Sequence, residues 1–364
     1  MKIHYLVTSL ESGGAEFAMP QILQTFLRHG HQVELTACEP RDMMAARRLE
    51  EAGLPYRVMF DRRRSKLTNV LGFLRVLQQT GRPDVIWTSL SLATYVGQAA
   101  GRLTGTPVVS WKHSASVKPY VYRTRQHIRL WVADCDGTAR FLRDDMQIPP
   151  GQVMTWPLFS CAITRHQRPA WNTGRCLQIG SVGRLHEVKN YPLLIQGIAL
   201  FRSRYPQYAG QVRLSILGEG PQRLELESLV SRLGLEAVVA LPGYSANVQH
   251  FLAGLDVYAQ PSRYEGMCLA VHEAMGSGLP AMATAVGEMA RSVQDGRTGF
   301  ILRGDIPQAV CDTLARIFAR PGCLTEYGAA ARAHIQAHYS AEAFDRAGAA
   351  ILEQISQRIL KRPG

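Results

Sequence analysis

Short apolar segments alternate with longer helical patterns along almost the whole chain, and this alternation limits the fold more than any other feature. Each interval between two apolar segments is long enough for a crossover helix, which would leave the strands parallel. We expect strands in the first half at residues 3–9, 32–38, 56–60, 84–89, 106–111 and 130–135. After an interruption, the same pattern predicts strands at 176–184, 212–220, 237–244, 256–262 and 279–285.

The chain has 364 residues, which is more than one ordinary hydrophobic core accommodates. A polar, proline-containing stretch at 164–175 separates the two series of strands and is the predicted linker. The predicted fold class is therefore α/β, with two Rossmann-like, doubly wound parallel-sheet domains at 1–165 and 166–340. The two domains would face a cleft lined by the carboxyl ends of the strands, where such sheets bind ligands. The remaining residues, 341–364, follow the capping Ser340 mainly as one amphipathic helix.

Composition excludes several classes of protein. Apolar residues make up 46% of the chain and charged residues 19%, and no run approaches the ~20 apolar residues of a membrane-spanning helix. The N-terminal sequence lacks a small-residue cleavage site, so we expect no signal peptide and a cytoplasmic protein. Seven scattered cysteines without a Cys-x-x-Cys pair predict reduced thiols and no structural metal. The formal charge of +12 favours an anionic partner, whether nucleic acid, a phosphorylated ligand or a membrane surface.

Gly13 and Gly14 follow the first predicted strand and precede a helix. Glycines let a backbone approach a ligand closely, and a helix N-terminus presents free N–H groups to an anion. The spacing does not match Gly-x-Gly-x-x-Gly, so the pair is not a dinucleotide fingerprint. A turn that merely needs a positive φ is the alternative interpretation.

Arg184 and Lys189 lie five positions apart after the first strand of the second series, and Asn190 follows as a helix-start residue. A nucleotide diphosphate leaving group needs its developing negative charge neutralised, and two fixed cations can do this without a metal. Two solvated surface cations are the alternative. The Leu-Gly-Glu-Gly-Pro turn at 217–221 also follows a strand, but it is weak support for phosphate binding by itself.

Two glutamates belong to the region of a helix predicted at 267–277. Glu265 would lie in the loop that enters the helix, and Glu273 would lie two turns inside it on a partly buried face, with Leu269, Ala270 and Ala274 toward the core. Carboxylates accept hydrogen bonds from adjacent hydroxyls, so the pair suits a sugar and a ribose bridged by a diphosphate over the helix N-terminus. A helix-dipole contact for one glutamate and solvent exposure for the other is the alternative.

Two further motifs lie in the first half. His113 follows a strand in a basic loop, where it would face the cleft unless it is a structural histidine. Asp134-Cys135-Asp136 has the Asp-x-Asp form that holds a divalent cation in another class of nucleotide-sugar enzymes, but its position before a helical pattern favours helix capping. We therefore predict no bound metal.

Together these stretches resemble the retaining glycosyltransferases of family 4, which have the GT-B fold, over nearly the whole chain. The matching stretches are SGGAE at 12–16, WKH at 111–113, VGRLHEVKN at 182–190, LGEGP at 217–221, YEGMCLAVHEAMGSGLP at 264–280 and DGRTGFIL at 295–302. The resemblance implies transfer of a sugar from a nucleotide donor with retention of the anomeric configuration and with neither metal nor other cofactor. It also implies an acceptor-binding first domain, a donor-binding second domain and a C-terminal helix that crosses back onto the first.

The resemblance assigns roles to individual residues. Arg184 and Lys189 would bind the donor diphosphate, and Glu265 would contact hydroxyls of the donor sugar. Glu273 would hold the ribose, and His113 would lie beside the donor sugar. Backbone groups would complete the donor site, those of Gly13, Gly14, Gly266, Met267, Cys268 and Leu269. The departing phosphate would act as the base, so neither glutamate need be a nucleophile.

The resemblance leaves the sugar and the acceptor less well defined. Gly266-Met267-Cys268 departs from the Gly-Phe-Gly or Gly-Phe-Pro of many family members, so the sugar preference can differ. UDP is favoured as the carrier by its frequency in the family. The expected acceptor is a saccharide or lipid-linked saccharide of surface polysaccharide or glycan biosynthesis. Cations at 61–66 and 111–129, with Trp111, Tyr120 and Tyr122 among them, predict contact with an anionic membrane at the inner face of the cell membrane.

Two other functions are compatible with parts of the sequence. A nucleotide-sugar epimerase or hydrolase on the same fold would alter or release the sugar without a separate acceptor. A basic nucleic-acid-binding protein would explain the charge, but no recognised reading module carries the cations and the two glutamates would have no role. We therefore expect no nucleic acid partner.

Overall fold

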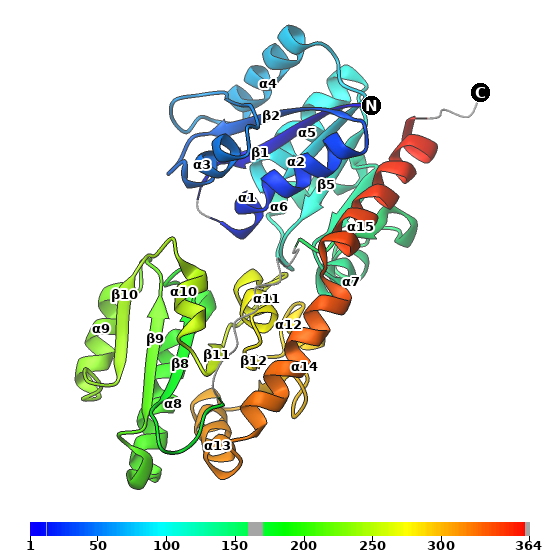
Figure 1. The fold of residues 1–364 in the computed structure, drawn as a ribbon. Helices are drawn as coiled ribbons and strands as arrows, with labels where there is room; N and C mark the ends of the chain where they lie inside the picture. The colour runs from blue at the N-terminus through cyan, green and yellow to red at the C-terminus, as the bar shows by residue number, and fades with distance from the viewer. Residues whose placement is uncertain (12, 159–169, 361–364) are drawn as a thin grey trace. The chain divides into compact units, whose positions relative to one another are not determined.

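The computed structural model describes residues 1–11, 13–158 and 170–360. The chain divides into two compact units, of which the first comprises residues 1–159 and 342–364 and the second residues 160–341 (Figure 1). Ser12, Cys161 and residues 164–169 of the predicted linker lie outside the described residues. In the described end of that linker, Trp171 lies in the core of the second unit, whereas Ala170 and residues 172–174 are exposed.

The first unit contains a seven-stranded sheet in which every neighbouring pair of strands is parallel. The strands are β1 (Lys2–Ser9), β2 (Gln32–Glu39), β3 (Tyr56–Val58), β4 (Val85–Ser89), β5 (Val108–Lys112), β6 (Leu130–Ala133) and β7 (Val153–Thr155). Their order is β3-β2-β1-β4-β5-β6-β7, so the direction of winding reverses between β1 and β4. The sequence predicted the first six strands and missed β7, which is only three residues long and half-buried.

Alternate residues of the strands face two separate hydrophobic clusters, as expected for a sheet covered on both faces. Tyr5 of β1 belongs to one cluster and its neighbour Leu6 to the other. The covering helices are α1 (Gly14–Phe17), α2 (Met19–Arg28), α3 (Met44–Glu51), α4 (Lys66–Thr80), α5 (Ser91–Thr104), α6 (Pro119–Thr124) and α7 (Asp136–Asp144).

The C-terminal helix completes the first unit, as predicted. Helix α15 (Ala341–Gln354) continues as a π-helical turn over Ile355–Leu360, and its apolar face joins the cluster that contains Tyr5. Phe344 of α15 lies 5.0 Å, between ring centres, from the fully buried Trp156. A Cβ atom at Gly348 would lie 2.5 Å from the same indole ring. Close packing against Trp156 therefore fixes this helix on the first unit.

The second unit contains a six-stranded sheet whose paired strands are also all parallel. Its strands are β8 (Leu177–Val182), β9 (Val212–Leu217), β10 (Val239–Gly243), β11 (Val257–Gln260), β12 (Ala281–Thr284) and β13 (Gly299–Leu302). The order β10-β9-β8-β11-β12-β13 places the reversal of winding between β8 and β11. The sequence predicted the first five, whereas β13 was noted only as part of a motif.

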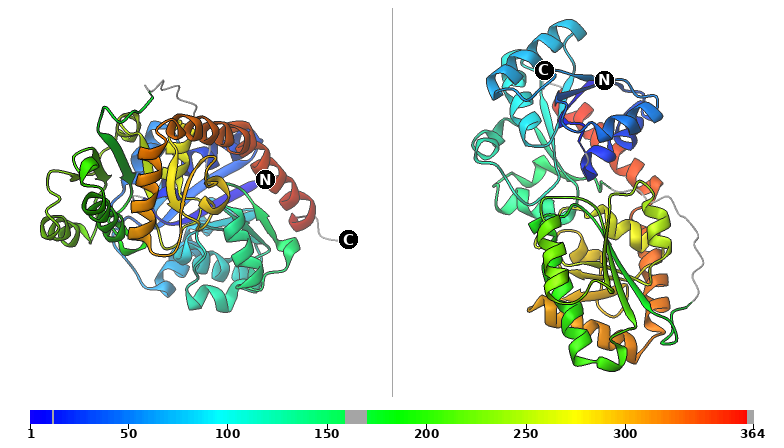
Figure 2. Two further views of the ribbon diagram at one scale, coloured as in Figure 1. Left: turned by 90° about the horizontal axis from the view of Figure 1, so that it is seen from below. Right: turned by 90° about the vertical axis from the view of Figure 1, so that its left-hand side faces the viewer.

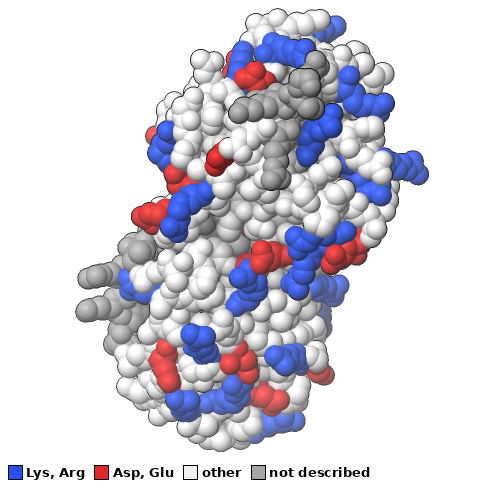
Figure 3. Space-filling model, turned by 90° about the vertical axis from the view of Figure 1, so that its right-hand side faces the viewer, with Lys and Arg blue, Asp and Glu red and all other residues white. Residues whose placement is uncertain are grey.

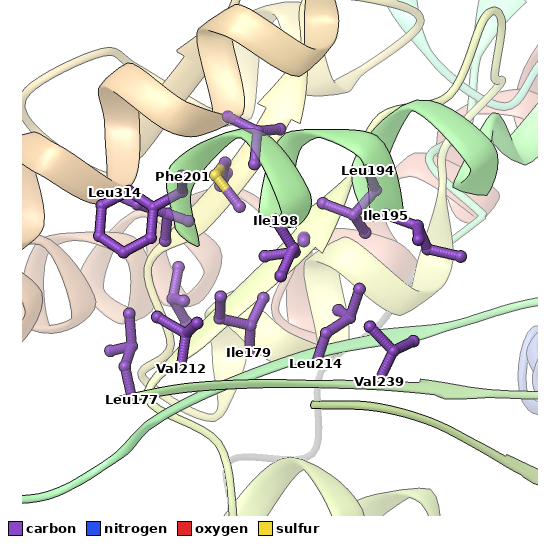
Figure 4. Packing of buried hydrophobic residues seen from close by; sticks show 14 of the residues in the cluster. Leu177, Ile179, Leu194, Ile195, Ile198, Phe201, Val212, Leu214, Val239 and Leu314 are labelled. Atoms are coloured by element: carbon purple, nitrogen blue, oxygen red, sulfur yellow. The ribbon is translucent and has the colours of Figure 1, made fainter. Parts of the chain in front are cut away.

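The helices of the second unit pack on a largely aliphatic core. They are α8 (Tyr191–Arg204), α9 (Arg223–Arg232), α10 (Val248–Ala253), α11 (Leu269–Gly276), α12 (Met289–Ser292), α13 (Ile306–Ala319) and α14 (Cys323–His338). Helices α8 and α13 contact each other (Figure 2). Leu194, Ile198 and Phe201 of α8 point from one stripe of the helix toward β8 and β9 (Figure 4). No helix in the described ranges has the length and apolar content to cross a membrane.

Candidate donor-binding site

The loops that carry the predicted cations and Glu265 leave from the two strands that flank the reversal in the second sheet. The loop after β8 contains Arg184 and Lys189, and the loop after β11 contains Glu265. Ligands of doubly wound sheets bind at this topological switch point, outside the carboxyl ends of the strands. The fold therefore brings these sequence-predicted residues to the one edge of the sheet where a ligand is expected.

Lys189 and Glu265 form an ion pair, although they are far apart in the sequence. The ammonium Nζ of Lys189 lies 2.7 Å from Oε1 of Glu265, and the two side chains are only 20% and 12% exposed. Burial alone would lower the pKa of Lys189, but the acidic groups of Cys268 and Glu265 beside it raise the pKa above its ordinary value. Lys189 therefore stays charged at neutral pH.

A chain of polar side chains fixes the Glu265 carboxylate in place. Ser262 Oγ donates a hydrogen bond to Oε1 of Glu265 at 2.7 Å, and Gln260 Nε2 donates to Ser262 Oγ at 2.8 Å. Tyr258 in turn donates to Oε1 of Gln260 at 3.2 Å. Because Tyr258 and Gln260 lie on strand β11, the position of Glu265 is tied to the centre of the sheet.

Arg184 lies in the same region but is exposed, and its guanidinium makes no hydrogen bond or ion pair with the described residues. Its loop is packed on the Leu-Gly-Glu-Gly-Pro turn, where Leu185 N donates to Glu219 O at 2.9 Å. A Cβ atom at Gly220 would lie 2.4 Å from the Leu185 carbonyl oxygen. The turn at 217–221 thus supports the loop that carries Arg184, which the sequence motif alone did not reveal.

Helix α11 begins at Leu269, two residues later than predicted. Cys268 precedes it with a left-handed backbone, with φ of 52°. A residue in this conformation cannot belong to a right-handed helix, so the helix starts only after Cys268. Among the described residues, no acceptor is hydrogen-bonded to the backbone N–H groups of Gly266, Met267, Cys268 and Leu269. Such unpaired N–H groups at a helix N-terminus favour an anion. Burial raises the pKa of the Cys268 thiol, so this side chain is neutral.

Glu273 is the fifth residue of α11, so it lies just over one turn into the helix rather than two. Its side chain is half-buried, as predicted. The predicted core face of this helix was partly wrong, because Leu269 and Ala270 are half-exposed whereas Val271 and His272 are fully buried with Ala274. Helical spacing places Val271, Ala274 and Met275 on one face, and this is the face that is buried.

Gly13 and Gly14 follow β1 at the reversal of the first sheet, but neither has a positive φ. Gly13 is extended, with φ of −161°, and a Cβ atom there would lie 2.2 Å from a carboxylate oxygen of Glu16. The interpretation as a positive-φ turn is therefore wrong, and the Glu16 carboxylate lies in the space beside Gly13. Burial raises the pKa of Glu16 to about 7. The SGGAE stretch at 12–16 includes Glu16, but no role was predicted for this residue.

His113 lies just beyond the end of β5, on the same edge of the first sheet. Its Nε2 atom lies 2.7 Å from Ser89 Oγ at the end of β4, and its ring stacks on Trp111 with 5.6 Å between the ring centres. Burial and, to a smaller extent, the charge of Lys112 lower the pKa of His113 to about 3. His113 is therefore a neutral imidazole that can exchange hydrogen bonds but supplies no charge.

The Asp-x-Asp motif lies at the start of a helix, as the helix-capping interpretation predicts, but the capping residue is the cysteine between the two aspartates. Helix α7 begins at Asp136, and its N-cap residue is Cys135, whose Sγ accepts a hydrogen bond from Thr138 N at 3.4 Å. Asp134 is buried at the end of β6. The cysteine, rather than either aspartate, thus caps the helix.

Sequence reasoning missed a buried polar cluster behind α11. It consists of His272, Glu288, Ser292 and Tyr339, all within the second unit. Three of these side chains are titratable, and such groups are seldom buried without a partner. Their positions along the chain have no regular spacing, so only the tertiary structure could bring them to attention.

Comparison with known families matches each unit to a glycosyltransferase model. A model described as glycosyltransferase family 4 matches residues 12–159, and one described as glycosyl transferases group 1 matches residues 177–320. A D-inositol 3-phosphate glycosyltransferase of Arthrobacter sp. (strain FB24) is 28% identical over 294 residues, which span 72% of this chain and 69% of the relative.

Solved structures agree with the fold. HepE of Anabaena in complex with UDP-glucose superimposes with a TM-score of 0.80 at 19% identity, covering 97% of this chain and 100% of HepE. The lipopolysaccharide outer core galactosyltransferase WaaB, in its apo form, gives a TM-score of 0.78 at 18% identity, with 97% and 100% of the two chains covered. At these identities the likeness establishes the two-sheet architecture.

Proposed function

Because the chain belongs to the family 4 and group 1 glycosyltransferases and has the GT-B fold, we propose that it is a retaining, metal-independent glycosyltransferase with a UDP-sugar donor. The proposed acceptor is a saccharide or lipid-linked saccharide of surface polysaccharide or glycan biosynthesis. The observation that carries the proposal is the Lys189–Glu265 pair beside the N-terminus of α11, at the switch point of the second sheet. The UDP and UDP-glucose named in the HepE complexes support UDP as the carrier.

The proposed donor site uses residues of the second unit. Arg184 and Lys189 bind the diphosphate together with the unpaired N–H groups at the start of α11. Glu265, whose position is fixed by Ser262, accepts hydrogen bonds from hydroxyls of the donor sugar. Glu273, on the half-buried side of α11, accepts from the ribose hydroxyls.

The proposed reaction needs charge stabilisation rather than a protein nucleophile. As the bond between the sugar and the diphosphate breaks, negative charge develops on the leaving phosphate, and Arg184 and Lys189 neutralise it without a metal. The phosphate accepts the proton of the attacking hydroxyl, which approaches on the face that the phosphate leaves, so the configuration is retained. On the first unit, neutral His113 is proposed to form a hydrogen bond with the donor sugar. Gly13 and Gly14 are proposed to allow the donor phosphate and the acceptor to approach the backbone closely.

Arg184→Ala is expected to weaken UDP binding by about 10-fold to 100-fold, because a charge-assisted hydrogen bond to phosphate is lost. Isothermal titration of UDP and GDP, with EDTA present, measures this. Arg303→Ala is the matched control, since Arg303 is also exposed and makes no hydrogen bond with the described residues. The donor site is wrong if neither nucleotide binds, or if binding requires a divalent ion. Rapid consumption of the UDP-sugar without any acceptor would instead indicate an epimerase or hydrolase.

We also propose that the first unit contacts an anionic membrane, with a different set of side chains from those predicted. Trp111 is 1% exposed in the core, so it cannot contact lipid. Tyr120 lies under Lys66, whose Nζ is 3.5 Å from the ring centre, and Arg125 covers the ring of Tyr122. These two tyrosines are thus engaged by cations of the same unit.

The more accessible apolar side chains lie on α4. Leu67 and Leu71 are 68% and 51% exposed, and their spacing places them on one face of that helix. Arg62, Arg63 and Lys66 next to them are exposed as well. On the face drawn in Figure 3, acidic side chains lie among the lysines and arginines mainly in the lower half of the view. Exposed leucines flanked by cations suit the interface of an anionic bilayer.

Sedimentation with lipid vesicles tests this surface. We expect the protein to sediment with vesicles that contain phosphatidylglycerol and to remain in solution with phosphatidylcholine alone, because each cation near an anionic surface contributes about 1 kcal/mol. Leu67→Ser/Leu71→Ser should abolish the binding, whereas Leu224→Ser, at an exposed leucine of the second unit, should leave it unchanged. Equal partition onto both kinds of vesicle would refute the proposal.

A further inference from the structure

A buried line of hydrogen-bonding groups runs from the start of α11 to the end of α14. His272 Nδ1 lies 3.0 Å from the Cys268 carbonyl oxygen, and His272 Nε2 lies 2.8 Å from Ser292 Oγ. Ser292 Oγ lies 3.2 Å from the hydroxyl of Tyr339, which donates to Glu288 Oε1 at 2.6 Å. All four side chains are at most 5% exposed, so water does not compete for these contacts.

Both ends of this line of hydrogen bonds contact the loop before α11, which is proposed above to bind the donor diphosphate. The Cys268 carbonyl, which accepts from His272, belongs to the residue with positive φ that precedes α11. The backbone N–H of Glu288 donates to the Gly266 carbonyl oxygen at 3.0 Å. The two ends of the line therefore hold the backbone of Gly266 and Cys268, whose N–H groups are the proposed diphosphate ligands.

The four contacts require four protons. The Cys268 carbonyl can only accept, so His272 Nδ1 carries a proton. Ser292 and Tyr339 have one proton each, which makes three. With an ionised Glu288 and a neutral His272, one contact of the line would therefore have no proton.

One further proton completes the line, and it can occupy either end. If Glu288 holds it, every hydroxyl donates toward a neutral His272. If His272 holds it, every hydroxyl donates toward an ionised Glu288. Burial lowers the pKa of His272 to about 4, with a smaller contribution from His334, which favours the first arrangement. Charged or titratable groups beside the line include Arg291, whose Nη1 lies 3.8 Å from Glu288 Oε1 and favours an ionised Glu288. His334 and His338 lie against the Tyr339 ring, and the Cys268 thiol belongs to the residue whose carbonyl His272 contacts.

We propose that His272, Ser292, Tyr339 and Glu288 form a proton-sharing chain that positions the Gly266–Cys268 backbone for the donor diphosphate. The proposal rests on the function proposed above. These four are positioning residues, since they are assigned no contact with the donor and act on it through the loop backbone. The shared proton keeps all four hydrogen bonds in place, and its loss would leave one contact of the line unpaired.

The test measures the loop without a ligand first. Tyr339→Phe and Ser292→Ala each break the line, and we expect faster amide hydrogen exchange in the segment 263–272 of the free protein. UDP affinity by titration should fall about fivefold to tenfold, the effect of one lost hydrogen bond or slightly more. Tyr327→Phe is the matched control, because Tyr327 is a buried tyrosine of α14, the helix that ends just before Tyr339, and its hydroxyl makes no hydrogen bond with the described residues.

Glu288→Gln tests the shared proton. The amide can donate permanently to Tyr339, so this variant should bind UDP like the wild type near neutral pH, whereas Glu288→Leu should not. Once the pH is high enough to remove the extra proton, the wild type should lose affinity and Glu288→Gln should not, because only the wild type can release that proton. The other titratable groups are common to both proteins and cancel in the comparison.

The outcomes separate this inference from the proposed function. Unchanged exchange of 263–272 in both Tyr339→Phe and Ser292→Ala would overturn the positioning role, whatever the protein binds. Identical pH profiles for wild type and Glu288→Gln would overturn the shared proton. Failure of the wild type to bind any nucleotide, together with faster exchange in both variants, would overturn the proposed function and leave the positioning of the loop supported.

Discussion

Replacing Lys189 by methionine is expected to weaken UDP binding about 100-fold and to lower kcat/KM by about 1,000-fold, as when a charged group that stabilises a transition state is removed. The same change should lower the free energy of unfolding by about 3 kcal/mol, because it leaves the mostly buried carboxylate of Glu265 without its cation. Methionine keeps the length of the side chain, so the loss reports mainly on the charge. Titration with UDP, steady-state kinetics and urea unfolding measure the three quantities.

A double-mutant cycle with Glu265→Gln separates binding from stability. Lys189→Met/Glu265→Gln leaves no buried charge unpaired, so most of the lost stability should return. UDP affinity should not return, since UDP has no sugar for Glu265 to contact and the missing ammonium is what the diphosphate needs. Glu265→Gln alone should bind UDP nearly as well as the wild type. Recovery of UDP affinity in the double mutant would mean that Lys189 serves only to neutralise Glu265.

The pairing of Lys189 with Glu265 illustrates what the sequence could and could not give. Both residues were predicted for the donor site from local motifs, because each follows a strand at the edge where such sheets bind ligands. That they contact each other depends on β8 and β11 being neighbours in the sheet. Strand order is a tertiary property, so no spacing along the chain encodes the ion pair.

Local conformation was predicted well where apolar periodicity is strong. It was predicted poorly where the conformation of a single residue determines where an element begins. The first strands of both sheets followed from their apolar runs, whereas β7 has only three half-buried residues and no such run. The start of α11 was misplaced because Met267 and Cys268 are apolar and fit a helical pattern. Cys268 has a left-handed backbone, which the apolar pattern of its neighbours does not encode.

The environment of individual side chains was the least predictable. Trp111 was grouped with surface cations because its sequence neighbours are basic, yet alternation along β5 turns it into the core beside Trp156. The alternative interpretation of Gly13, a turn with positive φ, was wrong because its backbone is extended. The error at Trp111 concerns a contact between segments that are far apart in the sequence, and the neighbours of Trp111 along the chain do not reveal that contact.

Gly287→Ala, which adds a single methyl group, is expected to disrupt the donor loop. Gly287 has φ of 56°, and a Cβ atom there would lie 2.3 Å from the Gly266 carbonyl oxygen and 2.6 Å from that of Glu265. A positive φ costs an alanine about 1 kcal/mol, and displacing two backbone groups should bring the loss of unfolding free energy to about 3 kcal/mol or more. Since the displaced groups belong to the residues that carry Glu265 and the start of α11, UDP binding should become undetectable by titration.

Gly304→Ala separates the steric contact from the backbone conformation. Gly304 also has a positive φ, of 67°, but a Cβ atom there would meet nothing within 4 Å. This variant should lose only about 1 kcal/mol in urea unfolding and should bind UDP like the wild type, because only the conformational cost applies. If the two variants lose the same stability and both keep their UDP affinity, the segment at Gly287 does not press on the donor loop. A large additional loss at Gly287 alone would mean that Glu265 and the N-terminus of α11 are held in position from behind by the backbone of that neighbouring segment.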